Sequence, residues 1–179
     1  EADPHGSPDQ VDYDAIEELR YPVLRKAFAR VTPELQEKID AYAGQEKGWL
    51  PDFTLFMSLR EVKYDCVALW DWPDSDVLHR KPKALAEARK ELAEEIAFRT
   101  FLQYEFHVQW HALRAYANKN GVQIIGDIPI YVSPDSSDVW ANPKFFKLKN
   151  DFSPKKIAGV PPDYFSETGQ LWGNPVYDW

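Results

Sequence analysis

The chain has 179 residues, of which 44% are hydrophobic and 15% aromatic, so it is long enough to bury a core. A net charge of −8 and a pI near 5.0 exclude partners that require clustered Lys and Arg, such as nucleic acids and anionic membranes. One cysteine, Cys66, excludes an internal disulfide and a cysteine-based metal cluster, and no signal peptide or apolar run of about 18 residues is found. We therefore expect a soluble, cytoplasmic protein.

Turn-forming and charged residues fill positions 1–10, which are expected to be a loop or a disordered end. Apolar residues at helical spacing then predict a first helix from Pro22, with the proline in its first turn. A second helix is predicted to start at Thr32 as N-cap and Pro33 as first helical residue, and to end at Gly44 as C-terminal cap. The two are expected to form a helical hairpin.

A third helix is predicted over residues 52–63, followed by a loop that reaches Pro82. The longest predicted helix covers residues 83–118. Its first half has a narrow apolar stripe and is expected to be solvated, whereas the aromatic residues of its second half predict burial on several faces. Residues 122–125, Val-Gln-Ile-Ile, predict a parallel β-strand of an α/β fold, with Asp127 at its carboxyl end, where ligands gather in such folds.

The last 54 residues contain seven of the 14 prolines and ten of the 26 aromatic residues, and are predicted to be a long ordered loop. Prolines lower the entropy lost on ordering, and flat rings beside carboxylates and amides suit the apolar faces and hydroxyl edges of a sugar. The density of rings and polar groups after Pro161 and Pro162 favours ligand contact over packing alone. This segment therefore predicts a carbohydrate-binding surface.

Other candidate sites have two interpretations each. Asp127 either accepts hydrogen bonds from sugar hydroxyls or caps a turn. Asp135 and Asp138 could begin a cation site, although helix capping by Asp135 or Ser136 and a core position for Trp140 are favoured. His107 and His111 share a helix face but lack the glutamate of a zinc-protease motif, so packing or surface roles are favoured over metal binding. No cofactor or metal is expected.

Three segments together carry a family resemblance. They are residues 126–132 (Gly-Asp-Ile-Pro-Ile-Tyr-Val), residues 135–143 (Asp-Ser-Ser-Asp-Val-Trp-Ala-Asn-Pro), and the run 158–179. They closely resemble the 4-α-glucanotransferases of glycoside hydrolase family 77, the amylomaltases or disproportionating enzymes. The segments 49–53, 70–73 and 101–104 resemble the helical part of that family, so the likeness spans residues 11–179.

The resemblance implies an α/β fold, an internal fragment of a (β/α)8 barrel that is mostly helical in its first two thirds. Residues 11–82 would be an inserted helical subdomain and 83–179 a partial barrel, with 159–175 as a loop over the glucan. By the same likeness, α-1,4-glucans and maltooligosaccharides are the partners, and the protein is a monomer or weak dimer. The implied substrate-binding residues are Asp127, Asp163, Tyr164, Phe165, Ser166, Gln170, Trp172 and Asn174.

The catalytic acids of the family are not found in this sequence. Retaining transfer needs a carboxylate nucleophile and a carboxylic acid about 5 Å apart, and the family places its nucleophile in an Arg-x-Asp-His motif that is absent here. Both acids are therefore expected beyond Trp179, in a longer polypeptide, and the fragment alone is expected to be inactive. Two alternatives remain open: a non-catalytic glucan-binding module and a helical scaffold.

Overall fold

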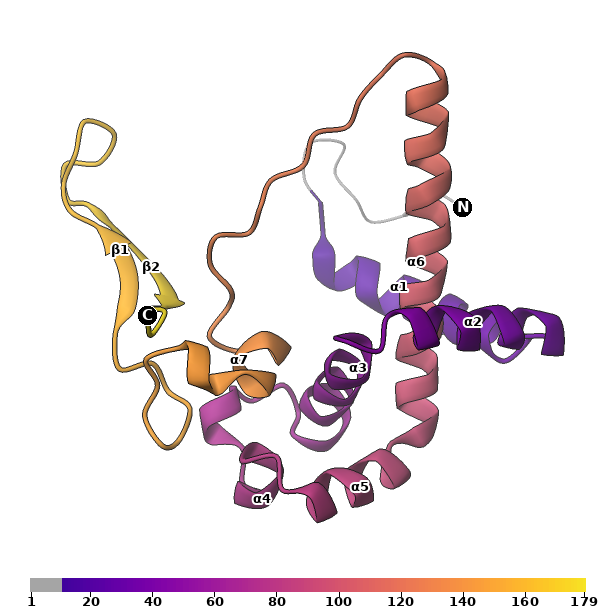
Figure 1. Cartoon of the computed structure of the whole chain (residues 1–179), viewed down its shortest axis with the longest axis horizontal. Coiled ribbons are helices and arrows are strands. Elements are labelled where there is room, and N and C mark those ends of the chain that lie inside the picture. Colours follow the sequence, from indigo (N-terminus) through magenta and orange to yellow (C-terminus); the bar gives the residue numbers. More distant parts are fainter. Residues whose placement is uncertain (1–10) are drawn as a thin grey trace.

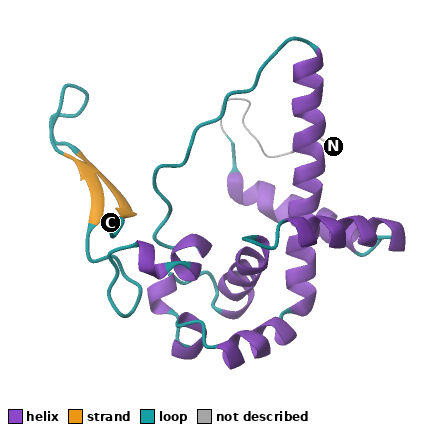
Figure 2. Cartoon of the chain, in the orientation of Figure 1, coloured by secondary structure: helices purple, strands orange, loops and turns teal. Residues whose placement is uncertain are grey.

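The computed structural model describes residues 11–179, so the predicted loop at 1–10 lies outside the described residues. A body of helices comes first, an extended segment follows, and an antiparallel hairpin lies near the C-terminus (Figures 1 and 2). The helices are α1 Tyr13–Phe28, α2 Pro33–Gln45, α3 Leu50–Ser58, α4 Ser75–Leu78, α5 Pro82–Glu91, α6 Ala93–Lys119 and α7 Ser137–Ala141; the strands are β1 Ile157–Val160 and β2 Gln170–Pro175. Three short turns are π- or 3-10-helical: Leu59–Lys63, Leu69–Asp71 and Pro143–Phe145.

The first helix starts nine residues before the predicted position. Asp12 is its N-cap, and the Asp12 carboxylate accepts a hydrogen bond from the backbone N–H of Ala15 at 3.0 Å. Pro22 lies inside α1 and has no N–H to donate to the carbonyl of Glu18, one turn earlier. Because Pro22 is exposed, water can bind this carbonyl instead. The predicted start at Pro22 is wrong because a cap upstream satisfies the first turn better.

The second helix begins as predicted, with Thr32 as N-cap and Pro33 in the first turn. It ends at Gln45, so Gly44 lies within the helix and not at its cap. The expected hairpin of α1 and α2 is replaced by packing of each helix on α6, around Ile39, Phe98 and Phe101 (Figure 1). The buried rings of Phe98 and Phe101 on α6 give both helices an apolar surface to pack against.

The third helix extends over the predicted range, but its last five residues, Leu59–Lys63, form a π-helical turn. The predicted loop before Pro82 contains the short helix α4, which Asp74 caps by accepting from the N–H groups of Asp76 and Val77. The predicted long helix is two helices, broken at Leu92, whose side chain is buried. The break allows α5 and α6 to bend around α3 (Figure 1).

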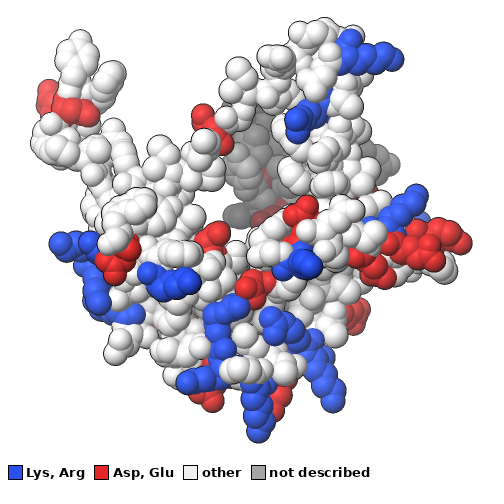
Figure 3. Space-filling view, in the orientation of Figure 1, with Lys and Arg blue, Asp and Glu red and all other residues white. Residues whose placement is uncertain are grey.

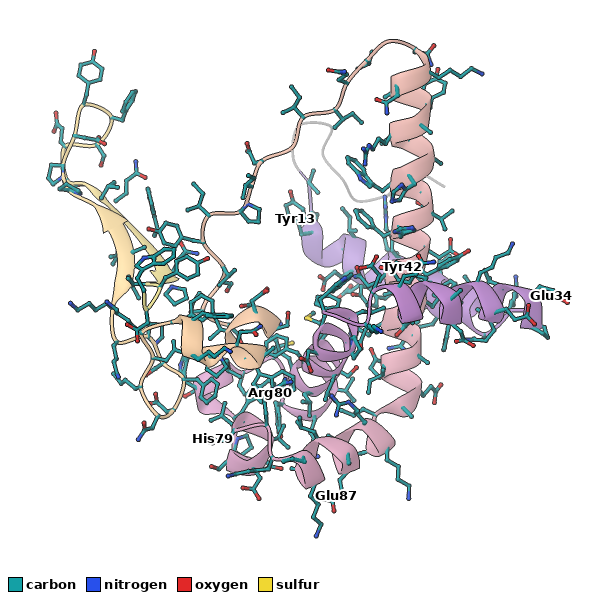
Figure 4. The ribbon with its side chains drawn as sticks, in the orientation of Figure 1. Tyr13, Glu34, Tyr42, His79, Arg80 and Glu87 are labelled. Atoms are coloured by element: carbon teal, nitrogen blue, oxygen red, sulfur yellow. The ribbon has the colours of Figure 1, made fainter. Side chains whose placement is uncertain are left out.

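The main core lies where α3, α4, α5 and α7 meet, and Trp140 is at its centre. This side chain is fully buried, and its indole N–H donates to the Val77 carbonyl at 3.2 Å, which confirms the predicted core position. Phe56 and Trp72 pack against it, with ring centroids 5.9 Å from Trp140 in both pairs. The guanidinium of Arg80, labelled in Figure 4, lies 4.4 Å from the centroid of the same indole. Trp140 thus joins α7 to helices more than 60 residues earlier in the chain.

A buried ionic network joins α1, α6 and the π-helical turn. Arg99 donates to Glu95 at 2.9 Å and to both carboxylate oxygens of Glu61, and Arg25 pairs with Glu95. Arg99 is 6% exposed, so these hydrogen bonds offset much of the cost of removing its charge from water. In Figure 3, other charged side chains gather over the helical body and below the hairpin, whereas the extended segment between α6 and α7 carries few on the face drawn.

The second half of α6 and the segment after it are exposed, against prediction. Phe106, Leu113 and Tyr116 are 65%, 54% and 69% exposed, and residues 122–125 form no strand. A strand requires a neighbouring strand for its N–H and C=O groups, and none of the described residues supplies one here. Within residues 11–179, no helix is both long enough and apolar enough to cross a bilayer.

Candidate functional site

The C-terminal segment forms a hairpin where the sequence predicted an ordered loop. β1 and β2 pair antiparallel, with Val160 opposite Gln170 and Gly159 opposite Leu171, and a bulge lies between Ile157 and Gly159. A Cβ atom on Gly159 would lie 2.6 Å from the Gln170 carbonyl oxygen, so only glycine permits this approach of the strands. The two strands hold the segment 161–169 at the tip of the hairpin, away from the helical body (Figure 1).

Hydrogen bonds within the tip give it a defined shape. The Asp163 carboxylate accepts from the backbone N–H groups of Phe165 and Ser166, both at 2.9 Å. The Ser166 hydroxyl donates to the Gly169 carbonyl at 2.8 Å. These are turn bonds of the type that Asp and Ser make with nearby backbone. Two predicted site residues, Asp163 and Ser166, therefore use their side chains to shape the tip.

Tyr164 and Phe165 project from the tip into solvent, with 96% and 88% of their surface exposed. Their ring centroids are 5.6 Å apart and the ring planes are nearly perpendicular, at 89°. Two large rings left in water on an ordered turn lose the stabilisation that burial would give, so they suit a role in contacting a ligand.

A second group of rings involves β2 and the residues on either side of the hairpin. Trp172 of β2 donates its indole N–H to the Gln170 side-chain oxygen at 2.9 Å, and its ring centroid lies 6.0 Å from that of Tyr131. Tyr131 in turn stacks on Tyr177 at 6.1 Å and 16°. The structure thus brings the predicted residues Gln170 and Trp172 together with Tyr131 and Tyr177, to which the sequence analysis assigned no role. The motif at 126–132 was the available signal for Tyr131.

Two hydrogen bonds attach the hairpin to the extended segment. The side-chain amide of Asn174, also a predicted site residue, donates to the Val132 carbonyl at 2.9 Å. The Tyr177 hydroxyl donates to the Ile130 carbonyl, also at 2.9 Å. The position of the hairpin therefore depends on residues 130–132, which come directly after the segment that carries Asp127.

Asp127 itself is exposed in the extended segment. The part of this segment before Ile130 and the hairpin tip lie apart in Figure 1, and no hydrogen bond found among the described residues joins them. Within this chain, the structure therefore does not bring Asp127 next to Tyr164 and Phe165, which the resemblance also implied as substrate-binding residues. Asp127 and the tip are each exposed, on different parts of the chain.

The metal-site alternatives receive no support from the geometry. Asp135 accepts from Arg60 at 2.9 Å and from the Leu69 N–H at 3.0 Å, and Ser136 caps α7, as the capping prediction required. His107 packs between Tyr42 and His111, with ring centroids 4.8 Å and 4.3 Å away. No group of three metal-binding side chains occurs within residues 11–179.

Comparison with known proteins gives a consistent result. A family model described as 4-alpha-glucanotransferase, of glycoside hydrolase family 77, matches residues 1–179. The chain is 45% identical to a 4-alpha-glucanotransferase of Clostridium butyricum over 172 residues, which are 96% of the chain and 35% of that protein. It is 44% identical to a 4-alpha-glucanotransferase of Thermus thermophilus, over 99% of the chain and 36% of the relative.

A solved structure is similar over nearly the whole chain. The amylomaltase from Streptococcus agalactiae in complex with acarbose superimposes with a TM-score of 0.91 and 44% identity, over 97% of this chain and 35% of that one. The observed arrangement of helices and hairpin is thus that of the corresponding part of an amylomaltase. The chain spans about a third of the length of these relatives.

Proposed function

The chain belongs to glycoside hydrolase family 77, the 4-alpha-glucanotransferases, and we propose that it is part of an enzyme that transfers α-1,4-glucan segments between maltooligosaccharides. The observation that carries this proposal, besides family membership, is the hairpin tip with its two exposed rings. Hydrogen bonds within the tip already hold it in shape, so little conformational entropy is lost when Tyr164 and Phe165 contact a ligand.

The proposed reaction is a retaining double displacement. A carboxylate attacks the anomeric carbon of the donor glucan, and a carboxylic acid protonates the departing glycosidic oxygen. The hydroxyl of an acceptor sugar then displaces the enzyme carboxylate and transfers its own proton to the acid/base residue. The two acids come from polypeptide outside this chain, in line with the share of its relatives that the chain covers.

The hairpin tip has the role of a cover in this scheme. Apolar rings lying over the bound glucan exclude water, which would otherwise resolve the covalent intermediate by hydrolysis. Gln170, Trp172 and Asn174 lie along β2 of the same hairpin, where amide groups and an indole face suit sugar hydroxyls and ring faces. Asp163 and Ser166 support binding by holding the tip in shape.

The proposal also accounts for the exposed segment after α6. In the complete protein, residues 122–125 pair with further strands of a (β/α)8 barrel, and Asp127 lies at a strand end among sugar-binding groups. The exposed apolar side chains of 122–130 and of the second half of α6 support this arrangement, since they need a cover. Residues 11–82 are then an inserted subdomain and residues 83–179 a part of the barrel.

Partners and location follow the same reasoning. The acidic charge favours uncharged glucans over nucleic acids, and the single exposed thiol of Cys66 suits the reducing cytoplasm. No cofactor is proposed, because retaining glucan transfer needs only the two carboxyl groups. We propose a monomer or weak dimer.

The test is the double variant Tyr164→Ala/Phe165→Ala in the full-length protein, assayed with maltotriose. The amount of glucose units transferred into longer chains is compared with the number of new reducing ends that hydrolysis produces. The ratio of hydrolysis to transfer is expected to rise by about fivefold or more, because the water-excluding cover is lost. Leu171→Ala is the control, since it removes an apolar side chain that is 76% exposed on the same hairpin. An unchanged ratio contradicts the role of the rings, and binding of glucan without any transfer by the unaltered protein contradicts the proposed enzyme.

A further inference from the structure

A groove runs between α3 and the start of α7. Two adjoining cavities form it, with volumes of about 410 and 430 Å³, and both are lined by Phe53, Ser137 and Asp138. Volumes of this order are within the ~300–1,000 Å³ typical of ligand sites. The two helices lie next to each other in the middle of the molecule, apart from the hairpin tip (Figure 1), and residues of both line the cavities.

The wall formed by α3 carries a row of apolar side chains beside Asp52. Trp49, Phe53 and Met57 are spaced four residues apart, which places them in one row along the helix. The Trp49 ring is held in position, because its indole N–H donates to the Glu46 carboxylate at 2.6 Å and its centroid lies 5.7 Å from that of Phe53. It is 43% exposed, so a rigid aromatic surface is available to a ligand.

The opposite wall is polar and comes from α7 and its flanks. Ser137, Asp138 and Asn142 contribute a hydroxyl, a carboxylate and an amide. These groups both donate and accept hydrogen bonds, as the hydroxyls along the edge of a sugar require. A ligand with one apolar face and a row of hydroxyls at its edge matches both walls at once.

The charges around the groove argue against an ionic ligand. Asp52 forms ion pairs with Arg80 at 2.8 Å and with Arg89 at 3.7 Å. Asp135 forms an ion pair with Arg60 at 2.9 Å. Ion pairs already neutralise Asp52 and Asp135, so a charged ligand would have to compete with their partners, and of the carboxylates that line the cavities Asp138 is left to accept hydrogen bonds. A neutral polyol avoids that competition.

We propose that the groove between α3 and α7 is an oligosaccharide-binding site, in which sugar rings stack along Trp49, Phe53 and Met57 and hydrogen-bond to Ser137, Asp138 and Asn142. The choice of an α-1,4-linked glucan as the occupant rests on the proposed function. The groove itself requires only an uncharged sugar with apolar ring faces.

The test uses the full-length protein and a maltopentaose whose glycosidic oxygens are replaced by sulfur, so that it resists cleavage. Hydrogen exchange is followed at increasing ligand concentration in residues 49–57 and 137–142, and separately in the tip, 161–169. We expect the ligand to slow exchange in both groove segments. In Trp49→Ala, the ligand concentration that slows exchange in the groove segments by half of the full effect is expected to rise about tenfold, because one apolar contact with the ligand is lost. Exchange in the tip should respond as in the unaltered protein.

Two further variants separate loss of stacking from loss of folding. Trp49→Phe retains an aromatic face and should respond to nearly the same ligand concentration as the unaltered protein. Asp138→Ala lies on the other wall and should also weaken the response, whereas the control Asp76→Ala, an exposed aspartate of α4, should not. The inference is overturned if ligand leaves the groove segments unchanged, or if Trp49→Ala and Asp138→Ala respond like the unaltered protein. Glucan transfer is assayed separately, so that failure of the proposed function is recognised by its absence.

Discussion

The side-chain amide of Asn174 donates a 2.9 Å hydrogen bond to the backbone carbonyl of Val132, 42 residues earlier in the chain. This contact joins β2 to the end of the extended segment, and the hydrogen bond from the Tyr177 hydroxyl to the Ile130 carbonyl reinforces it. Together with the backbone hydrogen bonds that join residues 145–147 to 176–178, these two side chains fix the orientation of the hairpin and hence of the rings at its tip.

Replacing Asn174 by Ala should loosen this attachment. One hydrogen bond contributes about 1 kcal/mol, so amide exchange in residues 157–175 should become about five times faster. Asn118→Ala, at an exposed position near the end of α6, is the control and should leave exchange in the hairpin unchanged. Equal exchange in the Asn174 variant and the unaltered protein would show that the hairpin is held by other contacts.

Two glycines should respond in opposite ways to substitution by Ala. Gly169 has φ +76°, and a Cβ there would lie 2.6 Å from the Val160 carbonyl oxygen, so Gly169→Ala should destabilise the hairpin by about 1–3 kcal/mol. Gly44 lies inside α2 with open space around its missing Cβ, and Gly44→Ala should stabilise the protein by about 0.5–1 kcal/mol. Hydrogen exchange measures the first effect and urea unfolding the second. A tolerated Gly169→Ala would mean that the tip relaxes easily.

Removing the buried charge of Arg99 should be costly. Arg99→Met takes one of two cationic partners from the buried Glu95, which keeps Arg25, and the bidentate partner from the partly exposed Glu61, and the free energy of unfolding should fall by about 3 kcal/mol. The matched control is Arg89→Met, because Arg89 is 44% exposed and lies 3.7 Å from Asp52, and its removal should cost less than about 1 kcal/mol. Urea unfolding at neutral pH gives both values; similar losses would show that burial of the network contributes little.

Tyr64 should make stability depend on alkaline pH. Its hydroxyl is buried without a hydrogen-bond partner among residues 11–179, and burial, assisted by Asp74 and Glu91, raises the pKa of the phenol to about 12. The unfolded state loses this proton near pH 10 and the folded state near pH 12. Below pH 10 both states keep the proton, and the free energy of unfolding has its full value. As the pH rises from 10 to 12, the free energy of unfolding should fall by about 2 kcal/mol, because the unfolded state gives up the proton more readily.

Tyr64→Phe provides the measurement. In this variant the free energy of unfolding should not show the fall of about 2 kcal/mol between pH 10 and pH 12. At pH 7 the variant should be more stable by about 1 kcal/mol, because the unpaired hydroxyl is removed. Tyr13→Phe, where the ring is 74% exposed, should leave the urea-unfolding profile between pH 7 and pH 12 unchanged. An identical alkaline loss in Tyr64→Phe would assign the pH dependence to another group.

Local signals in the sequence were sufficient for several features. Thr32 and Pro33 place the start of α2, since a cap and a first-turn proline act within one turn of helix. The first half of the predicted long helix was expected to be solvated, yet its apolar stripe, Leu85, Ala88 and Leu92, is buried in the core. The prolines and rings after Pro161 pointed to an ordered, exposed surface, and the motifs around residues 126–132 and 158–179 placed the chain in its family.

Features that depend on distant partners could not be predicted in this way. The break at Leu92, the pairing of β1 with β2 and the attachment of Asn174 to Val132 each involve groups that become neighbours only after folding. Residues 122–125 have the composition of a strand, yet no strand forms, because strand structure requires a second chain segment to complete its hydrogen bonds. The sequence by itself thus determined the family, the N-caps of α2 and α7 and the sugar-compatible residues of the C-terminal segment. The tertiary structure decided which of these residues meet, because burial and pairing are properties of contacts between segments far apart in the chain.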